Sequence, residues 1–487
     1  MGAAMNTLKT DLVVIGSGIA GLACSVTAAE KGADVILLEK RKVIGGNSRF
    51  AAGFFSCRKS GDPQQLSKEE LYERIISYHR GQFTDPSIIR AYLDKSEDTV
   101  RWLEGYGLEL IENGAGPNVG KKDTTTVFNI PKGTKRNGVY NAVQALHRRL
   151  DELGVRIFTE SRAVRILKKD GRVSAVEADI NGEKYEIETK AAVITTGGFT
   201  GNTELLKKYF YYYRDDYEGH MIPHAGDGLQ LAADAGAALY PRCGMVRETQ
   251  RDWAPSYLHF PLILALKRRG FLAVNQRGER VINENFISDE SNMTCNILDQ
   301  QPDGVVYIIY DDALIKEIDS KPSFGPMGPL PGLGEVFRIL NQEKKGALIA
   351  SDVEEAARWI GADPGVLRNT IETYSRYSKE HYDRQFFRKP ETMAALETPP
   401  YYVLKIGALM IDTIGPIRIN SRAEVLNDRF DPIPGLYCAG VAAGGWSSED
   451  YCARYQFGSC IGFSVNFGRI AGENALQYIM SDQQIIN

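Results

Sequence analysis

Short apolar runs separated by glycine-rich turns dominate the N-terminal part of the chain. Residues 11–15, Asp-Leu-Val-Val-Ile, form a compact apolar run that is typical of a strand buried in a parallel sheet. A stretch of small residues typical of a helix then extends to Lys31, and a second apolar run covers residues 34–38. The pattern predicts a strand, a helix and a second parallel strand.

The turn after the first strand reads Gly16-Ser17-Gly18-Ile19-Ala20-Gly21, and Glu39 ends the second strand 23 residues after Gly16. The glycines let the backbone approach a pyrophosphate at a helix N-terminus, and an acid at this distance can bind ribose hydroxyls. A carboxylate there repels a 2'-phosphate, which disfavours NADP. These residues therefore predict a site for FAD or NAD.

Later segments repeat the pattern of a strand that runs into a glycine-rich loop. Residues 155–193 predict short strands, with hairpin turns at Asp170-Gly171 and Asn181-Gly182. An apolar run at 191–194 leads into Thr195-Thr196-Gly197-Gly198, and a further glycine-rich stretch extends from Gly435 to Gly445. Two such loops favour a cofactor longer than a mononucleotide.

Composition excludes several classes of protein. The chain has 487 residues, of which 43% are hydrophobic and 25% charged, which suits large globular cores. Its net charge of -4, without a basic block, disfavours nucleic acid as a partner. The seven cysteines contain no C-x-x-C pair, and no apolar run reaches the roughly 18 to 20 residues of a membrane span. We therefore expect a cytoplasmic protein with reduced thiols, no membrane span and no metal site.

Seven motifs, in order along the chain, resemble those of a known family. They are Val14–Gly21, Glu39-Lys40 with Gly45-Gly46-Asn47-Ser48, Thr195–Gly198, Gly226-Asp227-Gly228, 274–284, Tyr437–Gly445 and 467–472. Together they resemble the fumarate reductase and succinate dehydrogenase flavoprotein superfamily, which includes ketosteroid and tricarballylate dehydrogenases. The resemblance implies an α/β protein in which a Rossmann-like FAD-binding domain is built from residues 1–239 and 396–487. Residues 240–395 would form an inserted α+β capping domain.

The resemblance also implies which residues line the FAD. Gly16, Gly18 and Gly21 would take the pyrophosphate, and Glu39 the ribose. Gly46, Asn47 and Ser48 would follow the ribityl chain and isoalloxazine, with Asp227 and Gly440 contributed by later segments. The other expected cofactor positions are Ala20, Lys40, Gly53, Val164, Thr196, Gly197, Ser459 and Ile461. Respiratory members bond flavin covalently to a histidine near the Ser48 position. No histidine lies within 25 residues of Ser48, so noncovalent FAD is expected.

Departures from the fumarate reductases indicate a different substrate. Ser288 falls where those enzymes have a proton-delivering Arg. Asp412 precedes Thr413 where a carboxylate-binding His is expected. Because an acid repels a dicarboxylate, fumarate and succinate are disfavoured as substrates.

The candidate catalytic residues lie near the C-terminus. Tyr455 falls where fumarate reductases have a substrate-binding Arg and ketosteroid dehydrogenases have a Tyr, and Arg454 stands just before it. A phenol can polarise a ketone or transfer a proton, and a guanidinium can anchor a carboxylate or carbonyl. Alternatively, Tyr455 packs over the flavin and Arg454 lies at the surface or neutralises a phosphate. Tyr451 and Tyr257 are further candidates, and either could instead belong to the core or the pocket wall.

The leading hypothesis is an FAD-dependent oxidoreductase that dehydrogenates or reduces a C–C bond next to a carbonyl through hydride exchange with flavin N5. Its small-molecule substrate would be a ketone or a carboxylate other than fumarate, and its electron donor or acceptor is unidentified. One alternative is an FAD oxidase acting on a C–O or C–N bond. The other is a non-catalytic flavoprotein subunit of an electron-transfer complex.

Overall fold

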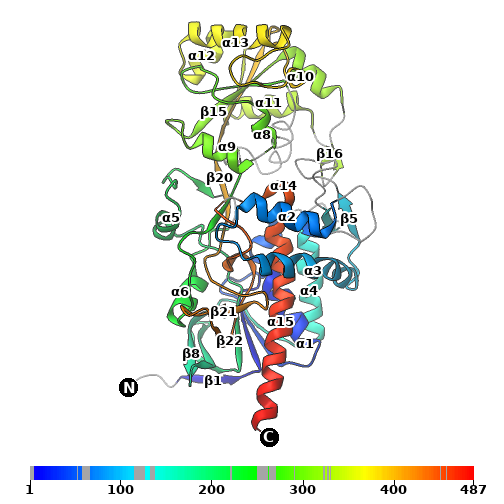
Figure 1. Ribbon diagram of the computed structural model, residues 1–487, viewed down its shortest axis with the longest axis vertical. Helices are drawn as coiled ribbons and strands as arrows, with labels where there is room; N and C mark the ends of the chain where they lie inside the picture. The colour runs from blue at the N-terminus through cyan, green and yellow to red at the C-terminus, as the bar shows by residue number, and fades with distance from the viewer. Residues whose placement is uncertain are drawn as a thin grey trace. The chain divides into compact units, whose positions relative to one another are not determined.

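The computed structural model describes residues 5–486 except 52, 57–65, 114–126, 132–137, 220–221, 249–261, 263–269, 290, 322–323, 326–327, 330, 450 and 457. The chain divides into two compact units, and many of its helices and strands are labelled in Figure 1. Unit 1 contains Met1–Tyr213, Met221–Val246 and Asp412–Asn487. Unit 2 contains Arg214–His220 and Arg247–Ile411. The fold is therefore mixed α/β.

The largest sheet of unit 1 has six strands in the order β21-β22-β11-β2-β3-β7. Every neighbouring pair is parallel except β21 and β22, which are antiparallel. The strands are β2 (Leu12–Ile15), β3 (Val35–Leu38), β7 (Arg156–Phe158), β11 (Ala191–Ile194), β21 (Glu424–Leu426) and β22 (Pro432–Cys438). Strands β2, β3 and β11 are buried at every position, as expected of parallel strands covered on both faces.

The predicted strand, helix and second strand at the N-terminus are confirmed as β2, α1 (Ile19–Ala29) and β3. Helix α1 is buried from Ile19 to Ala28 because the long C-terminal helix α15 (Ser459–Ile486) packs along it. In Figure 1, α15 is the red helix that runs past α1 and α3. A Cβ on Gly472 would lie 2.7 Å from the Cys24 carbonyl oxygen, so only glycine permits this close helix packing.

Both predicted hairpin turns are also confirmed. Asp170-Gly171 joins β8 (Ser161–Lys169) to β9 (Arg172–Ile180), and Asn181-Gly182 joins β9 to β10 (Glu183–Glu188). All four turn residues have φ between 52° and 87°, the left-handed pair that a two-residue hairpin loop requires. Strand β1 (Asn6–Lys9) pairs in parallel with β10 and completes this four-stranded sheet.

The remaining elements of unit 1 are mostly helices. They are α2 (Lys68–His79), α3 (Pro86–Glu104), α4 (Gly138–Glu152), α5 (Thr203–Tyr209), α6 (Asp227–Asp234) and α14 (Ala453–Gln456), with the short helical turns η1 (Gly46–Phe50) and η4 (Gly440–Ala442). A small antiparallel sheet contains β4 (Phe54–Ser56), β5 (Leu110–Asn113) and β6 (Val127–Pro131).

Unit 2 is built on a four-stranded antiparallel sheet in the order β14-β15-β19-β18. Its strands are β14 (Leu272–Val274), β15 (Val305–Asp311), β18 (Ala347–Ala350) and β19 (Tyr401–Gly407). Its helices are α8 (Asn285–Asp289), α9 (Ser291–Leu298), α10 (Asp312–Asp319), α11 (Leu333–Gln342), α12 (Val353–Ile360) and α13 (Pro364–Lys379). The remaining short elements are β16 (Phe324–Gly325), β17 (Gly328–Pro329) and η3 (Pro390–Thr392).

The boundaries between the units differ from the expected 239/240 and 395/396. The chain leaves unit 1 within β13 (Gly244–Glu248) and returns within β20 (Leu409–Ile414). The expected return at 396 is too early because β19 pairs with both β15 and β18 of unit 2. The short segment Arg214–His220, which includes β12 (Glu218–Gly219), also belongs to unit 2.

A buried charge network stabilises the core of unit 2. Arg280 donates to both oxygens of Glu284 at 2.8 Å and to Asp383 at 2.8 Å. Arg388 donates to Glu284 at 3.0 Å and to the Tyr374 hydroxyl at 2.9 Å. The side chains of Arg280, Glu284 and Asp383 are 0% exposed, so each charge depends on its partners for solvation.

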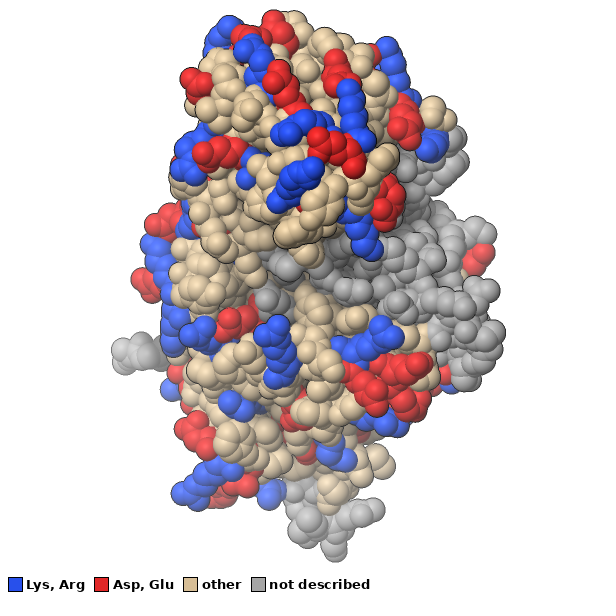
Figure 2. Space-filling model, turned by 45° about the horizontal axis from the view of Figure 1, so that its top comes forward, with Lys and Arg blue, Asp and Glu red and all other residues tan. Residues whose placement is uncertain are grey.

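Charged side chains of both signs are interspersed on the face seen in Figure 2. This mixture agrees with the near balance of 58 Lys and Arg against 62 Asp and Glu.

Among the described residues, no helix combines the length and the apolar character that crossing a membrane requires.

We predict that Glu284→Ala lowers the free energy of unfolding by about 3 to 5 kcal/mol, because it leaves two buried guanidinium groups without their shared carboxylate. Urea denaturation followed by far-UV circular dichroism measures this loss. The matched control is Arg277→Ala, which removes an ion pair to Glu279 whose arginine is 73% exposed, and it should leave the urea midpoint unchanged. Equal midpoints for the parent and Glu284→Ala would show that the network does not stabilise unit 2.

Candidate active site

The turn between β2 and α1 is held in one conformation by packing against β11. Gly16 has a φ of 106°, and a Cβ there would lie 2.5 Å from the Thr195 carbonyl oxygen. The Thr195 hydroxyl donates to the carbonyl oxygens of Ile15 and Gly16 at 2.9 and 2.7 Å. The turn therefore needs glycine at position 16, and Thr195 fixes it to the end of the neighbouring strand.

Glu39 closes the same turn from β3. It is 7% exposed, and its Oε2 accepts from the Ser17 amide at 3.0 Å and the Ser17 hydroxyl at 2.5 Å. Its Oε1 accepts from the Arg41 amide at 2.8 Å. Glu39, the residue predicted to bind the ribose, thus lies beside the glycine turn. Its carboxylate also holds the backbone of that turn in place.

The Gly45–Ser48 loop faces the glycine turn. Ser48 Oγ accepts from the Ile19 amide at 3.1 Å, so it lies at the N-terminus of α1. A Cβ on Gly46 would lie 3.8 Å from Gly18 Cα, and a Cβ on Gly18 would lie 3.9 Å from Ser48 Oγ. Two stretches of backbone without side chains therefore face each other at a helix N-terminus, which is the arrangement that binds a pyrophosphate.

Segments from later in the chain meet this turn. Gly440 lies against Ala20, since a Cβ on Gly440 would be 3.1 Å from Ala20 Cβ. The His224 ring lies against Gly197, and the Ile222 amide donates to Asn47 Oδ1 at 3.0 Å. The fold therefore brings positions 20 and 440 into contact, and residues 222–224 connect positions 47 and 197.

A second group of predicted positions lies around Asp227, the first residue of α6. Asp227 accepts from Lys40 and, at 2.9 Å, from Arg162. Burial acts to raise the pKa of Asp227, but these two cations outweigh it and hold the pKa below its ordinary value. Val164 lies two residues from Arg162 on β8 and is 55% exposed.

Asp412 is a buried acid of unit 1. In the sequence it was noted only as a departure from the fumarate reductases. It is 8% exposed, its Oδ1 accepts from the Thr413 amide at 2.9 Å, and this oxygen packs against Gly198. Burial raises the pKa of Asp412 to about 7, against the Thr413 amide and the nearby Asn47 side chain, which lower it. Burial and the nearby Asp412 also raise the pKa of the Cys460 thiol, so Asp412 lies close to the start of α15.

Three of the four predicted catalytic residues, Tyr451, Arg454 and Tyr455, lie in or just before α14. Tyr455 is half-buried, and its ring meets that of Tyr78 edge-on with centroids 6.3 Å apart. Tyr451 is buried, and its hydroxyl donates to the Gln456 carbonyl and accepts from the Ser459 amide, each at 3.0 Å. Burial is the main cause that raises the pKa of Tyr451. Tyr451 therefore joins the end of α14 to the start of α15, which favours a structural role.

For some predicted positions the structure shows only the element in which they lie. Arg454 lies in α14, Ser288 in α8 and Ile461 in α15, whereas Gly53 is buried just before β4. Tyr257 lies outside the described residues. In the part of the chain that the structure describes, no group of three or more His, Cys, Asp or Glu side chains could hold a metal ion.

Several buried polar atoms have no hydrogen-bond partner among the described residues. Thr196 Oγ1 and His224 Nδ1 are two of them, and each lies at or beside a predicted cofactor position. An unsatisfied buried polar atom costs about 1 to 3 kcal/mol, so a ligand that supplies partners is favoured. Together with the glycine-lined turn, they fit a flavin dinucleotide. His224 was not among the predicted cofactor positions, because no motif in the sequence indicates that it lies beside Gly197.

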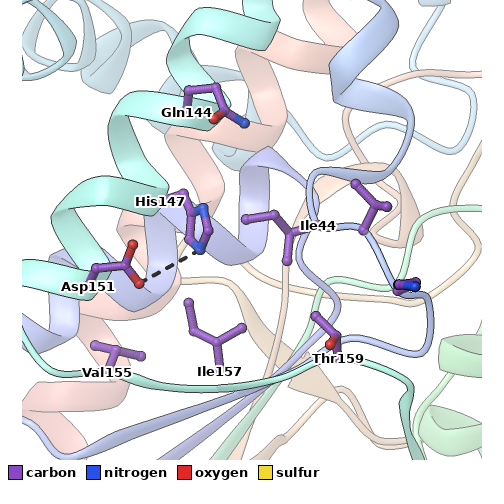
Figure 3. Close-up of a pocket in the computed structure, with 9 residues that line it drawn as sticks. Ile44, Gln144, His147, Asp151, Val155, Ile157 and Thr159 are labelled. Atoms are coloured by element: carbon purple, nitrogen blue, oxygen red, sulfur yellow. Dashed lines mark ion pairs between the residues drawn. The ribbon is translucent and has the colours of Figure 1, made fainter.

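A separate groove of about 570 Å³ lies between α4 and β7 (Figure 3). Ile44, Ile157 and His147 line it, and His147 Nε2 lies 3.8 Å from Asp151 Oδ1. None of the predicted site residues lines this groove. We therefore assign it no part in the chemistry.

Comparison with known proteins identifies the family. The model of the family described as "FAD binding domain" matches residues 11–449, which is most of the chain. The chain belongs to this family. The predicted membership of the fumarate reductase and succinate dehydrogenase flavoprotein superfamily is thereby confirmed, and so is FAD as cofactor.

Relatives match along nearly the whole chain. A vinyl phenol reductase of Lactiplantibacillus plantarum is 27% identical over 96% of this chain and 96% of its own length. A fumarate reductase (cytochrome) of Shewanella frigidimarina is 28% identical over 96% of this chain and 77% of its own length. The open conformation of a flavocytochrome c3 fumarate reductase superposes with a TM-score of 0.74 at 25% identity, covering 97% of this chain and 79% of that one. The fold is also that of a 3-ketosteroid-Δ4-(5α)-dehydrogenase from Rhodococcus jostii RHA1, with a TM-score of 0.72 at 23% identity, covering 98% of both chains.

These matches support one class of chemistry. The relatives are named reductases and dehydrogenases, so the chain is an FAD-dependent oxidoreductase, as the sequence predicted at this level.

We predict that Glu39→Ala weakens FAD binding roughly 10- to 100-fold, because three donors around the glycine turn lose their charged acceptor. Equilibrium dialysis of the purified protein against FAD, read at 450 nm, gives the dissociation constant. Glu152→Ala, which removes a side chain 62% exposed in unit 1, is the control and should bind FAD as the parent does. An unchanged dissociation constant for Glu39→Ala would contradict this role.

We also predict that Asp412→Asn stabilises the protein more at pH 8 than at pH 5. The folded pKa of Asp412, about 7, lies above its ordinary value, so between about pH 4 and 7 the folded protein keeps a proton that the unfolded chain loses. Stability therefore falls as the pH rises through this window, and an amide escapes that loss, which is on the order of 1 to 4 kcal/mol. Thermal melts of both flavin-loaded proteins at the two pH values measure it. A difference in melting temperature that does not depend on pH would mean that Asp412 ionises normally.

Proposed function

We propose that this protein exchanges a hydride between bound FAD and a C–C bond conjugated with a carbonyl, in a ketone or a carboxylate other than fumarate. The observation that carries the proposal is the position of α14, which holds Arg454 and Tyr455 and directly precedes the start of α15. The first residues of α15 include Ser459, a predicted cofactor position, and Cys460, which lies near Asp412.

Each part of the site has a separate task in this proposal. When bound, FAD would supply the hydride acceptor or donor at its N5 atom. Gly16, Gly18 and Gly21 would hold the pyrophosphate, Glu39 would bind the ribose, and Ser48 would follow the ribityl chain and isoalloxazine. The noncovalent attachment follows from the lack of a histidine near Ser48.

The substrate would be oriented from α14. Tyr455 can donate a hydrogen bond or a proton to the carbonyl oxygen, because charge develops on that oxygen as the adjacent C–C bond reacts. Arg454 can anchor a carboxylate or carbonyl of the same substrate. Above about pH 7 the ionised carboxylate of Asp412 disfavours a dicarboxylate, which supports a substrate other than fumarate.

Named relatives support the same choice of substrates. A urocanate reductase is similar to this chain over 96% of its length at 27% identity. The vinyl phenol reductase is similar to the same extent, but the double bond of a vinyl phenol is conjugated with a phenol ring and not with a carbonyl, so vinyl phenols are tested beside the carbonyl compounds. A 4-oxocyclohex-2-ene-1-carboxylate 5-dehydrogenase is 24% identical over 96% of the chain. Conjugated ketones and unsaturated acids are therefore the compounds to test first, together with their saturated counterparts, since hydride exchange can run either way.

We predict that Tyr455→Phe keeps its FAD, but that substrate bleaches or reoxidises the bound flavin roughly 100- to 10,000-fold more slowly. This factor is the usual contribution of a positioned acid or base. The measurement follows flavin absorbance anaerobically while enones, unsaturated acids and their saturated counterparts are added. Tyr211→Phe is the matched control, because that ring is 80% exposed, and it should react at the parent rate. A Tyr455→Phe variant that responds as fast as the parent would remove Tyr455 from the mechanism.

A further inference from the structure

His79, the last residue of α2, makes contacts with a segment far along the chain. It is 2% exposed, and its Nδ1 lies 2.8 Å from the hydroxyl of Ser448, 369 residues later. The Ser448 amide also points at this nitrogen, at 3.3 Å. Its Nε2 lies 3.4 Å from the side-chain oxygen of Gln456. Both ring nitrogens are thus directed at one stretch of chain, residues 448–456, which we call the α14 segment.

The contacts fix the protonation of the ring. A backbone N–H can only donate, so Nδ1 of His79 accepts from Ser448 and carries no proton. Nε2 then carries the proton and donates to Gln456. Burial lowers the pKa of His79 to about 4, against the Gln456 hydrogen bond, which raises it. The ring therefore stays neutral at ordinary pH and keeps one donor and one acceptor.

The α14 segment needs such external support. Helix α14 has only 4 residues, a length that does not form a stable helix by itself. Ser448 and Gln456 are the two ends of the segment, and Tyr455 lies next to Gln456. The ring of Tyr78, the neighbour of His79, meets Tyr455 edge-on.

A second contact strengthens the connection. The Asp85 amide, just before α3, donates to the Gly445 carbonyl at 2.7 Å, and Thr84 forms a bridge with the same glycine. The chain from His79 to Asp85 thus holds residues 445–456 at several points.

We propose that His79 is a positioning residue which, through Ser448 and Gln456, fixes α14 and with it the phenol of Tyr455. This inference rests on the proposed role of Tyr455 in the reaction. A displacement of about 1 Å at a reacting group can cost roughly 100-fold in rate, so the bonds of His79 should control turnover without any contact with substrate.

A double-mutant cycle tests the proposal on the flavin-loaded protein. The parent, His79→Phe, Tyr455→Phe and the double variant are compared by the rate of flavin bleaching or reoxidation per bound flavin, with the substrate found in the screen above. We expect His79→Phe to react about 10- to 100-fold more slowly, with a smaller change in KM. We expect the double variant to react no more slowly than Tyr455→Phe, because a phenol that has been removed can no longer be misplaced.

Two further variants separate positioning from folding. His79→Gln should recover much of the rate, since its amide can still donate to Gln456. His147→Phe, which changes a histidine of α4 that lies outside the site, should react as the parent does. If His79→Phe loses its flavin, His79→Asn replaces it in the cycle, because it can still accept from Ser448 and loses only the bond to Gln456.

The possible failures are distinguishable. A His79→Phe variant with the parent rate, or equal slowing by His79→Phe with and without Tyr455, contradicts the positioning role and leaves the proposed function intact. A Tyr455→Phe variant with the parent rate contradicts the proposed role of Tyr455, and the inference about His79 is overturned with it.

Discussion

The buried carboxylate of Glu39 is the group on which the geometry of the cofactor turn depends. Gly16 must follow β2 with a positive φ, and the following amide of Ser17 then points at Glu39, where β3 ends. The carboxylate accepts two bonds from Ser17 and one from Arg41, so it joins the ends of two parallel strands. Because parallel strands end at the same edge of a sheet, a single acid there can both shape the turn and face the ligand.

The same constraint explains why both ends of the chain are needed. Strand β11 lies between β2 and β22, so the end of β22 reaches the turn from the opposite side, and Gly440 arrives against Ala20. Helix α15 then packs along α1, where Gly472 allows its backbone to approach Cys24. For the position of α15, the small size of the residues at these contacts matters more than the apolar area that they bury. A larger side chain would separate the helices and move the loop before α15.

The sequence was sufficient wherever a local pattern determines the structure. The run from Leu12 to Leu38 and the turns at Asn181-Gly182 and Asp170-Gly171 were predictable, because burial on both faces and left-handed turn residues leave short-range signals. The return of the chain to unit 1 was placed too early, because β19 is assigned to unit 2 only by its pairing with β15 and β18. Such pairing joins residues about 50 to 100 positions apart and leaves no local mark.

Burial decides the charge of the groups around the α14 segment, and no sequence pattern reports it. Asp412 stands within the otherwise mostly apolar strand β20, which is a visible anomaly, but only its depth raises its pKa to about 7. His79 resembles any histidine at the end of a surface helix, yet its surroundings keep it neutral. A protonated carboxyl can donate a hydrogen bond, whereas the carboxylate formed above pH 7 repels anions. The charge that this region of unit 1 presents to an acidic substrate therefore depends on how deeply one side chain is buried, and that depth is set by the close approach of Gly198, Asn47 and the start of α15.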